Sequence, residues 1–312
     1  MPVSNNPIQD ASVTPVVENV NLHEHVAQAP ELMQEAQPAD RVLGLSAAEM
    51  NDPNSIKVTV SDPKAPLVIL FGPPACGKTM TLVRMTRFLK SEGYTVSPIR
   101  TFRPTSDTNY AEICEKFDET MNSNNAAAST NRISFMLVEV IKNGHRLCQI
   151  LEAPGEYYFN PKKPNDSFPN YVNTIIASSN RKVWTIMIEP DWMDNTDRMN
   201  YVTKITRLKQ CMRSKDSVIF VLNKIDRTGY VRSVGDVDKS AAIRDIKNLY
   251  PNIFLPFMNQ NPITKWIKEY NCEFVPFQTG YYTSALNGFT YQEGPREYCV
   301  KLWNAIMNNI RG

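Results

Sequence analysis

The sequence predicts a three-layer α/β fold built on a doubly wound, mostly parallel sheet that contains one antiparallel hairpin. Short apolar runs alternate with segments of helical spacing, which is the pattern of strands covered by helices on both faces. A glycine-rich loop stands between the first apolar run and the first helical segment. Asn143-Gly144 separates two β-rich runs, and this dipeptide is a strong signal for a tight type I′ hairpin turn.

Up to the hairpin, the first strand and the first helix have the clearest patterns. Residues 67–71 form a continuous apolar run, as expected of a strand buried on both faces. Apolar residues recur at helical spacing over 78–90. The other segments predicted in this half are a strand at 94–99, a helix at 110–121, a loop at 122–130, and hairpin arms at 133–141 and 145–151.

After the hairpin, helices and strands continue to alternate. The predicted segments are helix 170–179, strand 183–188, helix 196–212, strand 217–222, helix 237–249, strand 272–277 and helix 296–310. Ligands of sheets wound in this way bind at the carboxyl ends of the strands, so the loops that follow strands are the places to search for a site.

Composition divides the chain into two parts. Residues 1–57 are rich in Pro, Asn, Gln, Ala and Glu and poor in aromatic residues, so we expect a disordered tail. One exception is 39–50, which could form a short helix that docks on a partner. Residues 58–312 carry the α/β pattern and form the predicted domain.

Charge, apolar runs and cysteines exclude several classes of protein. The formal net charge of +2 gives no indication of nucleic-acid binding or of attraction to a membrane surface. No apolar run approaches the ~20 residues of a membrane-spanning helix, and the first residues do not resemble a secretory signal. The six cysteines lack a CxxC pair, which favours reduced thiols over a zinc site or disulfides. These features predict a cytoplasmic protein.

A phosphate-binding loop is the strongest motif. Residues 72–79, Gly-Pro-Pro-Ala-Cys-Gly-Lys-Thr, fit GxxxxGK[ST] between a predicted strand and a predicted helix. Glycines let backbone N–H groups turn toward phosphate oxygens, and the helix N-terminus favours an anion. Lys78 is expected to reach the β- and γ-phosphates, and the Thr79 hydroxyl to bind Mg²⁺. The predicted phosphate-binding residues are Gly72, Pro73, Pro74, Ala75, Cys76, Gly77, Lys78, Thr79 and Met80.

The second motif is Asn223-Lys224-Ile225-Asp226, directly after the predicted strand 217–222. It resembles the NKxD motif of GTPases. An Asp226 carboxylate can accept hydrogen bonds from the guanine N1–H and 2-amino groups, whereas adenine would leave it unpaired, and an unpaired buried group gives strong discrimination. The stem of Lys224 is expected to lie over the base plane. Asn223, Lys224 and Asp226 are therefore predicted to bind the nucleotide.

The third motif is Glu152-Ala-Pro-Gly155, after the second hairpin arm. It resembles the DxxG motif, in which the carboxylate holds Mg²⁺ through water and the glycine N–H meets the γ-phosphate. Here Glu152 replaces the usual Asp, so the metal geometry differs. Glu156 stands where many relatives have Gln or His to orient the attacking water. At this position it could act as a general base, or it could have no role in hydrolysis.

A fourth, weaker motif is Ser284-Ala285-Leu286, which follows the last predicted strand. It resembles the SA[KL] loop, whose backbone N–H contacts the guanine oxygen. These four motifs occur in order over residues 67–286 and resemble the P-loop GTPase superfamily, in particular a divergent, bacterial-like branch of its translation-factor and Ras-like (TRAFAC-type) class. Relative to a minimal member, the spacing is longer near 94–131 and 229–271.

The resemblance implies GTP or GDP with Mg²⁺ as ligands and slow GTP hydrolysis by a nucleotide-dependent switch or assembly regulator. Glu152 and Glu156 favour an alternative, a GTP-binding interaction module with little hydrolysis. A third possibility is an ATPase or small-molecule kinase, against which Asn223 and Asp226 argue. The resemblance also implies mobile loops at 122–131 and 156–168 as contact sites for a regulatory or effector protein.

Two catalytic assignments depend on position in the chain. The threonine that binds Mg²⁺ in the GTP state usually precedes the first hairpin strand, which selects Thr130, with Thr101 and Thr105 as rivals. Arg103, or Arg100, could supply an arginine to the γ-phosphate, although a basic surface loop accounts for them more simply. The predicted catalytic residues are Lys78, Glu156 and Arg103, and the predicted metal ligands are Thr79, Thr130 and Glu152.

Overall fold

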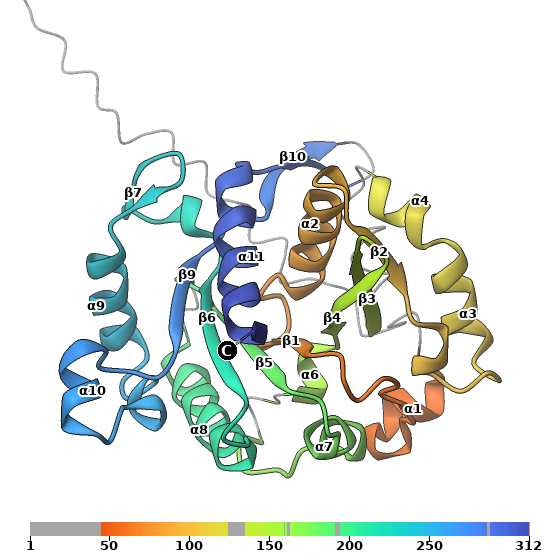
Figure 1. Cartoon of the computed structure of the whole chain (residues 1–312), viewed down its shortest axis with the longest axis horizontal. Coiled ribbons are helices and arrows are strands. Elements are labelled where there is room, and N and C mark those ends of the chain that lie inside the picture. The colour runs from red at the N-terminus through yellow and green to blue at the C-terminus, as the bar shows by residue number, and fades with distance from the viewer. Residues whose placement is uncertain are drawn as a thin grey trace, which may run out of the picture. The chain divides into compact units, whose positions relative to one another are not determined.

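The computed structural model describes residues 45–123, 135–158, 160, 163–190, 194–285 and 288–311. Within them, the central element is a seven-stranded sheet with the order β2-β3-β4-β1-β5-β6-β9 (Figure 1). Its strands are β1 Leu67–Phe71, β2 Thr95–Pro98, β3 Met136–Lys142, β4 His145–Glu152, β5 Lys182–Ile188, β6 Ser217–Leu222 and β9 Glu273–Pro276.

The pairing of these strands confirms the predicted fold class. β1 lies parallel between β4 and β5, and the parallel arrangement continues through β6 to β9. β3 runs antiparallel to both β2 and β4. At the turn between β3 and β4, Asn143 and Gly144 have φ angles of 52° and 76°, as a type I′ turn requires. The hairpin inferred from the Asn-Gly dipeptide is therefore present.

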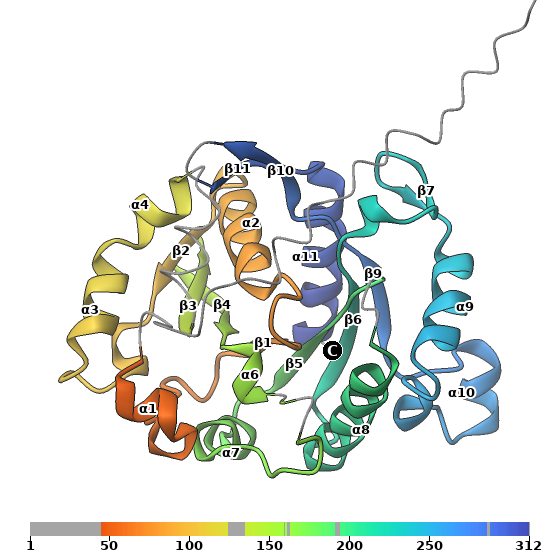
Figure 2. The same ribbon diagram turned by 180° about the vertical axis from the view of Figure 1, so that it is seen from behind.

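Helices cover both faces of the sheet. α2 and α11 pack on one face, and α6, α7 and α8 lie on the other (Figures 1 and 2). The helices are α1 Ala47–Asn51, α2 Lys78–Ser91, α3 Thr108–Glu115, α4 Phe117–Asn122, α6 Gly155–Tyr158, α7 Asn170–Ala177, α8 Asn195–Cys211, α9 Lys239–Leu249, α10 Pro262–Ile267 and α11 Arg296–Arg311. Two small hairpins, β7 Val231–Ser233 with β8 Asp236–Val237 and β10 Gly280–Ala285 with β11 Gly288–Glu293, complete the described strands. None of the described helices is both long and apolar enough to cross a bilayer.

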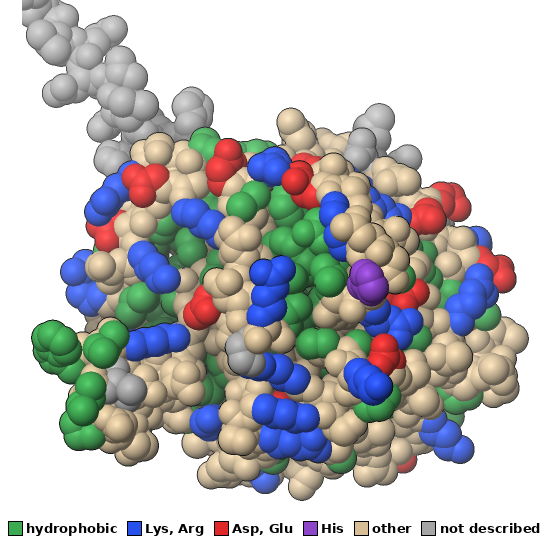
Figure 3. All heavy atoms as spheres, viewed as in Figure 1, with side chains coloured by type: hydrophobic (Ala, Val, Ile, Leu, Met, Phe, Trp, Pro, Cys, Tyr) green, Lys and Arg blue, Asp and Glu red, His purple; other side chains and the backbone are tan. Residues whose placement is uncertain are grey.

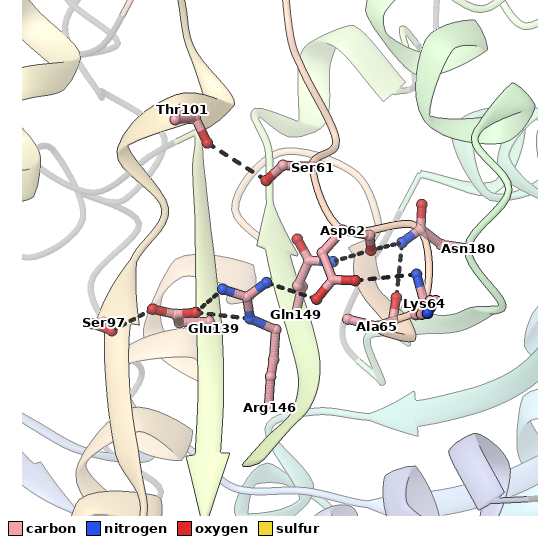
Figure 4. Close-up of polar contacts among 10 residues, drawn as sticks. All are labelled: Ser61, Asp62, Lys64, Ala65, Ser97, Thr101, Glu139, Arg146, Gln149 and Asn180. Carbon is pink, nitrogen blue, oxygen red and sulfur yellow. Dashed lines mark hydrogen bonds and ion pairs between the residues drawn. The ribbon is translucent and has the colours of Figure 1, made fainter. Parts of the chain in front are cut away.

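The segment before β1 is hydrogen bonded to β4 on one side and to the residues that lead into β5 on the other (Figure 4). The Arg146 guanidinium, on β4, donates to Asp62 Oδ2 at 2.7 Å and to Glu139 Oε2, on β3, at 2.8 Å. On the other side, Asn180 Nδ2 donates to the carbonyls of Asp62 and Ala65, both at 2.8 Å. These contacts fix where β1 begins and hence where its carboxyl end delivers the glycine-rich loop.

Residues 45–57 correct the predicted extent of the tail. They form α1 and the short 3₁₀ helix η2 Pro53–Ser55, and Leu45 and Ile56 are 4% and 3% exposed within the core. Ser46 caps α1 through a capping box with Glu49. The average composition of 1–57 is polar, but two apolar anchors and one cap are enough to dock its last part. The rest of the predicted tail, residues 1–44, lies outside the described residues.

Two truncations should separate the docked part from the rest. Removing residues 1–44 is expected to leave the melting temperature unchanged, because their composition gives them no core to join. Removing residues 1–57 deletes two buried apolar side chains and should lower the free energy of unfolding by at least about 3 kcal/mol. Urea unfolding of the two variants and the full chain measures this. Equal midpoints for the full chain and the 1–57 deletion would refute the docking of 45–57.

Candidate functional site

Three loops meet at the carboxyl edge of the sheet because the strands that precede them are adjacent and parallel. Residues 72–79 follow β1, residues 152–155 close β4, and residues 223–226 follow β6. In the sheet order, β4 and β1 are neighbours, and only β5 stands between β1 and β6. The structure therefore brings together three motifs that are separated in the sequence.

The loop after β1 is tightly packed around its glycines. Gly77 has a φ angle of +87°, and a Cβ added to it would lie 2.3 Å from Asn223 Nδ2. A Cβ on Gly72 would lie 2.6 Å from Cys76 Sγ. Ala75 has a φ angle of 60°, a left-handed conformation that is unfavourable for a residue with a side chain. Local strain of this kind is typical of ligand cradles.

The side chains inside the loop have distinct roles. Lys78 begins α2, and its ammonium is buried and donates to the Pro73 carbonyl at 2.8 Å, so the side chain folds back over the loop. Met80 is buried against Tyr291 of β11. Burial raises the pKa of the Cys76 thiol to about 11, with Lys78 opposing the shift. Cys76 therefore stays protonated at neutral pH and fills space, and it is not a nucleophile.

A buried carboxylate joins the first and third motifs. Glu152 is 1% exposed at the end of β4. Its Oε1 accepts a hydrogen bond of 2.9 Å from Thr79 Oγ1, and its Oε2 accepts one of 2.7 Å from the Phe135 N–H. A hydroxyl and a carboxylate are hard oxygen donors, which is the ligand chemistry of Mg²⁺. The described residues contain no cluster of three or more acidic, His or Cys side chains suited to a metal, and Mg²⁺ sites with few carboxylates rely on substrate phosphates.

Gly155 brings the third motif against the first. It is buried at the start of α6, and a Cβ added to it would lie 2.4 Å from the carbonyl carbon of Pro73 and from the nitrogen of Pro74. No side chain could be accommodated there unless one backbone moved. The approach places the Gly155 segment beside the loop that would hold the phosphates.

Asn223 fastens the second motif to the same loop. Its side-chain amide Nδ2 donates to the Cys76 carbonyl at 2.9 Å, and its backbone N–H donates to Ile188 at the end of β5. Lys224 has a φ angle of 55°, and its ammonium pairs with Glu189 at 3.0 Å. Asp226 is exposed in the 3₁₀ helix η4 Ile225–Arg227. The loop is thus anchored at Asn223 and presents Asp226 outward.

The predicted fourth motif lies elsewhere than expected. Ser284 and Ala285 belong to β10 and approach the end of its hairpin with β11, whereas a loop was predicted, and Leu286 lies outside the described residues. The loop that directly follows β9 is instead Phe277, Gln278 and Thr279. The Phe277 backbone donates a hydrogen bond of 2.8 Å to Leu222, the last residue of β6, and accepts one of 3.2 Å from Ile225 of the second motif.

Gln278 is a residue that the sequence analysis missed. It is 3% exposed, and its Nε2 has no hydrogen-bond partner in the described part of the chain. An unpaired buried donor is costly, so it is a position where a ligand acceptor would be stabilising. Gln278 could have been found from its position in the sequence, because it follows the predicted strand 272–277 directly. Ser284 comes several residues later.

The contacts of Arg103 argue against the predicted role at a phosphate. Its guanidinium is buried and donates to Glu49 at 2.6 Å, to Asp107 at 2.9 Å and to the Lys57 carbonyl at 2.8 Å. Each of the three guanidinium nitrogens thus donates to one of these partners, and Arg103 holds the docked segment 45–57 in place. Its sequence context gave no hint of Glu49, which precedes it by more than fifty residues.

The remaining predicted residues divide into described and undescribed ones. Thr130 lies outside the described residues, as does most of the predicted loop 122–131. Its rival Thr101 faces Ser61 at 3.5 Å (Figure 4), and Thr105 is exposed. The backbone of Glu156 lies in α6, next to Gly155. Tyr158 of the same helix is buried and packs on Phe71, with ring centroids 5.1 Å apart.

The similarities between this chain and known proteins lie in the fold. No family model matches the sequence, and no curated protein does. The putative nucleolar GTP-binding protein 1 of Plasmodium falciparum matches 82% of this chain and 90% of its own, with 15% identity and a TM-score of 0.39. The Ski7 GTPase-like domain of S. cerevisiae matches 84% of this chain, with 14% identity and a TM-score of 0.40. Translation elongation factor SelB of Methanococcus maripaludis matches 81%, with 12% identity and a TM-score of 0.32.

The first of these structures is a putative GTP-binding protein, the second a GTPase-like domain and the third a translation elongation factor. The chain spans about half of the matched Ski7 chain, 52%, and 35% of the SelB chain. At such identities and TM-scores the matches say nothing of a ligand, so nucleotide binding has to be judged from the residues of the site.

Replacing Gly155 with Ala tests the close packing of the two loops. The added methyl group would meet the backbone of Pro73 and Pro74, so we expect the free energy of unfolding to fall by about 1–3 kcal/mol. Gly229→Ala is the matched control, because a Cβ there has no neighbour within 4 Å. Chemical denaturation measures both variants. Equal stability of Gly155→Ala and the parent would mean that the loops do not touch.

Proposed function

We propose that this protein binds GTP and GDP with Mg²⁺ and hydrolyses GTP slowly, acting as a nucleotide-dependent switch or assembly regulator. The observation that carries the proposal is the convergence of three motifs on one loop. Thr79 contacts Glu152 at 2.9 Å, and Asn223 contacts the Cys76 carbonyl at 2.9 Å. A chance match of one short pattern would not bring the other two to the same place.

The phosphate end of the nucleotide would be held by the loop after β1. Its backbone N–H groups and the N-terminus of α2 favour an anion, and Lys78 would exchange its contact with Pro73 for the β- and γ-phosphates. Thr79 and Glu152 would hold Mg²⁺, which when bound neutralises charge on the transferring phosphoryl group. The Gly155 N–H would face the γ-phosphate.

The base would be read by residues after β6 and β9. Asp226 would accept from the guanine N1–H and 2-amino groups, with the Lys224 stem beside the ring. We assign the neighbouring polar position to Gln278, in place of Ser284-Ala285-Leu286. Phe277 is hydrogen bonded to the second motif, and the Gln278 amide nitrogen has no hydrogen-bond partner among the described residues. A guanine carbonyl oxygen is an acceptor of the kind that donor needs.

Hydrolysis would transfer the γ-phosphoryl group to water and leave GDP. Positioning and charge stabilisation by Lys78, Mg²⁺ and backbone amides supply most of the catalysis in this chemistry. Glu156 is the remaining candidate for orienting the water, since Arg103 is occupied elsewhere. Because Arg103 is held by these other partners, a low intrinsic rate is expected.

A binding module with little hydrolysis is the second candidate. Two observations favour it. Arg103 is already paired with Glu49, and glutamate stands at positions 152 and 156. An ATPase or small-molecule kinase is a third, disfavoured by Asn223 and Asp226. In either GTP-binding version, loops 122–131 and 156–168 are the expected contacts for a regulatory or effector protein, in the cytoplasm.

Lys78→Ala tests nucleotide binding itself. It removes a charge-assisted contact to two phosphates and should weaken GTP and GDP binding by at least about 100-fold, or ~2.7 kcal/mol. Lys90→Ala, at the other end of α2, is the control and should bind like the parent. Titration with a fluorescent GDP analogue measures all three proteins. Unchanged affinity in a folded Lys78→Ala variant would remove the phosphate-loop assignment.

Asp226→Asn tests the base. The new amide would place a donor against the guanine 2-amino group, whereas xanthine offers a carbonyl there. GTP binding should weaken by at least about tenfold, or ~1.4 kcal/mol, and XTP binding should improve. Asp236→Asn, another exposed aspartate, serves as the control. A variant that still prefers GTP over XTP would show that Asp226 does not read the base.

Single-turnover hydrolysis separates the first two candidates. A switch should release phosphate from bound GTP slowly but above the Lys78→Ala background, and Glu156→Ala should lower that rate if Glu156 orients the water. Radiolabelled GTP with excess protein measures the step. Phosphate release equal to the background, together with tight GTP binding, would select the binding module over the switch.

A further inference from the structure

Helix α10 presents an apolar face to solvent. Ile263, Trp266 and Ile267 are 72%, 89% and 74% exposed. Their spacing of three and four residues places them on one side of a helix. Large apolar side chains scattered singly on a surface are ordinary, but three grouped ones that include a tryptophan mark a contact surface.

The segment that carries α10 is firmly anchored. Phe254 and Phe257, which precede the helix, are buried against Phe220 of β6, with ring centroids 4.9 and 5.4 Å away. Tyr270, which follows it, packs on Phe254 at 5.5 Å and pairs with Met258. The packed residues before and after α10 therefore hold its apolar face toward solvent.

A basic cavity adjoins this helix. It has a volume of about 250 Å³ and is lined by Arg181, Lys215 and Lys268, with Asp216 as its one carboxylate. Lys268 immediately follows α10. Both Asp216 oxygens already accept backbone hydrogen bonds of 3.0 Å, from Lys182 and Arg213.

The cavity is suited to an anion with several acceptor oxygens. Three cationic side chains outnumber the one carboxylate that faces it. The Arg181 Nε is buried and has no hydrogen-bond partner in the described part of the chain. A phosphate group would accept hydrogen bonds from the cationic side chains that line the cavity and compensate their positive charge.

The apolar face and the cavity lie together, away from the proposed nucleotide site. The cavity residues stand at the amino ends of β5, β6 and β9, whereas the phosphate-binding loop follows the carboxyl end of β1. Figure 3 shows hydrophobic side chains protruding at the edge where Figure 1 has α10, with Lys and Arg side chains spread over the same face. A planar partner on this side would leave the nucleotide site free.

We propose that this face docks on an anionic phospholipid bilayer, with α10 inserted at the headgroup boundary and the cavity occupied by a lipid phosphate. Tryptophan beside lysine is the composition that favours the interface, where the ring is buried and the ammonium groups meet anionic headgroups. A second copy of the chain fits less well, because Lys265 and Lys268 would face their own equivalents across a two-fold contact. The proposal does not depend on the nucleotide site.

Vesicle flotation of the purified full chain tests it. The protein should float with vesicles of phosphatidylcholine mixed with phosphatidylserine, not with phosphatidylcholine alone, and added salt should release it. Trp266→Ser and the double variant Arg181→Gln with Lys268→Gln should each reduce the bound fraction at least about tenfold, while Trp266→Phe retains most of it. Because Trp266 is exposed, its substitution should leave the melting temperature unchanged.

Matched controls keep the result specific. Val234→Ser removes another exposed apolar side chain, and Lys116→Gln with Arg296→Gln removes two exposed charges elsewhere, so both should float like the parent. Absence of flotation with anionic vesicles would overturn the proposal and leave a protein partner as the occupant of α10. Equal losses in the control and test variants, or equal binding to both vesicle types, would overturn it as well.

Discussion

The buried carboxyl group of Glu152 is the constraint on which the site depends. A polar group removed from water is costly unless hydrogen bonds compensate it, so its oxygens need partners. Thr79 supplies one donor from the first turn of α2, and the Phe135 N–H supplies the other from the residue before β3. One side chain thereby fixes the end of β4, the start of α2 and the beginning of the hairpin relative to each other.

Close backbone packing extends this constraint to the other loops. Gly155 and Gly77 stand where an added Cβ would collide with Pro73 and with Asn223, so the three motifs approach more closely than side chains would allow. Asn223 then hydrogen bonds to the Cys76 carbonyl, which stabilises the loop after β1. The carboxyl edge of the sheet is accordingly rigid and polar, whereas its opposite edge carries the basic cavity and the apolar face of α10.

The sequence by itself determined the elements whose signals are local. The apolar run of 67–71 is the observed β1 because a strand buried on both faces needs no alternation. The Asn143-Gly144 turn followed from the two positive φ angles that a type I′ turn imposes. The three motifs after β1, β4 and β6 were visible because each is contiguous, and adjacent parallel strands bring such loops to one edge.

Only the tertiary structure decided what depends on residues far apart in the chain. Arg103 was a candidate for phosphate binding until Glu49 and Asp107 appeared as its partners, and the same ion pairs order a segment whose average composition is that of a tail. In the proposed site Gln278 takes the place of Ser284, because backbone hydrogen bonds join Phe277, the residue after β9, to Leu222 and Ile225. A net charge of +2 conceals the basic cavity, since its cations come from separate loops and gather only when the sheet forms.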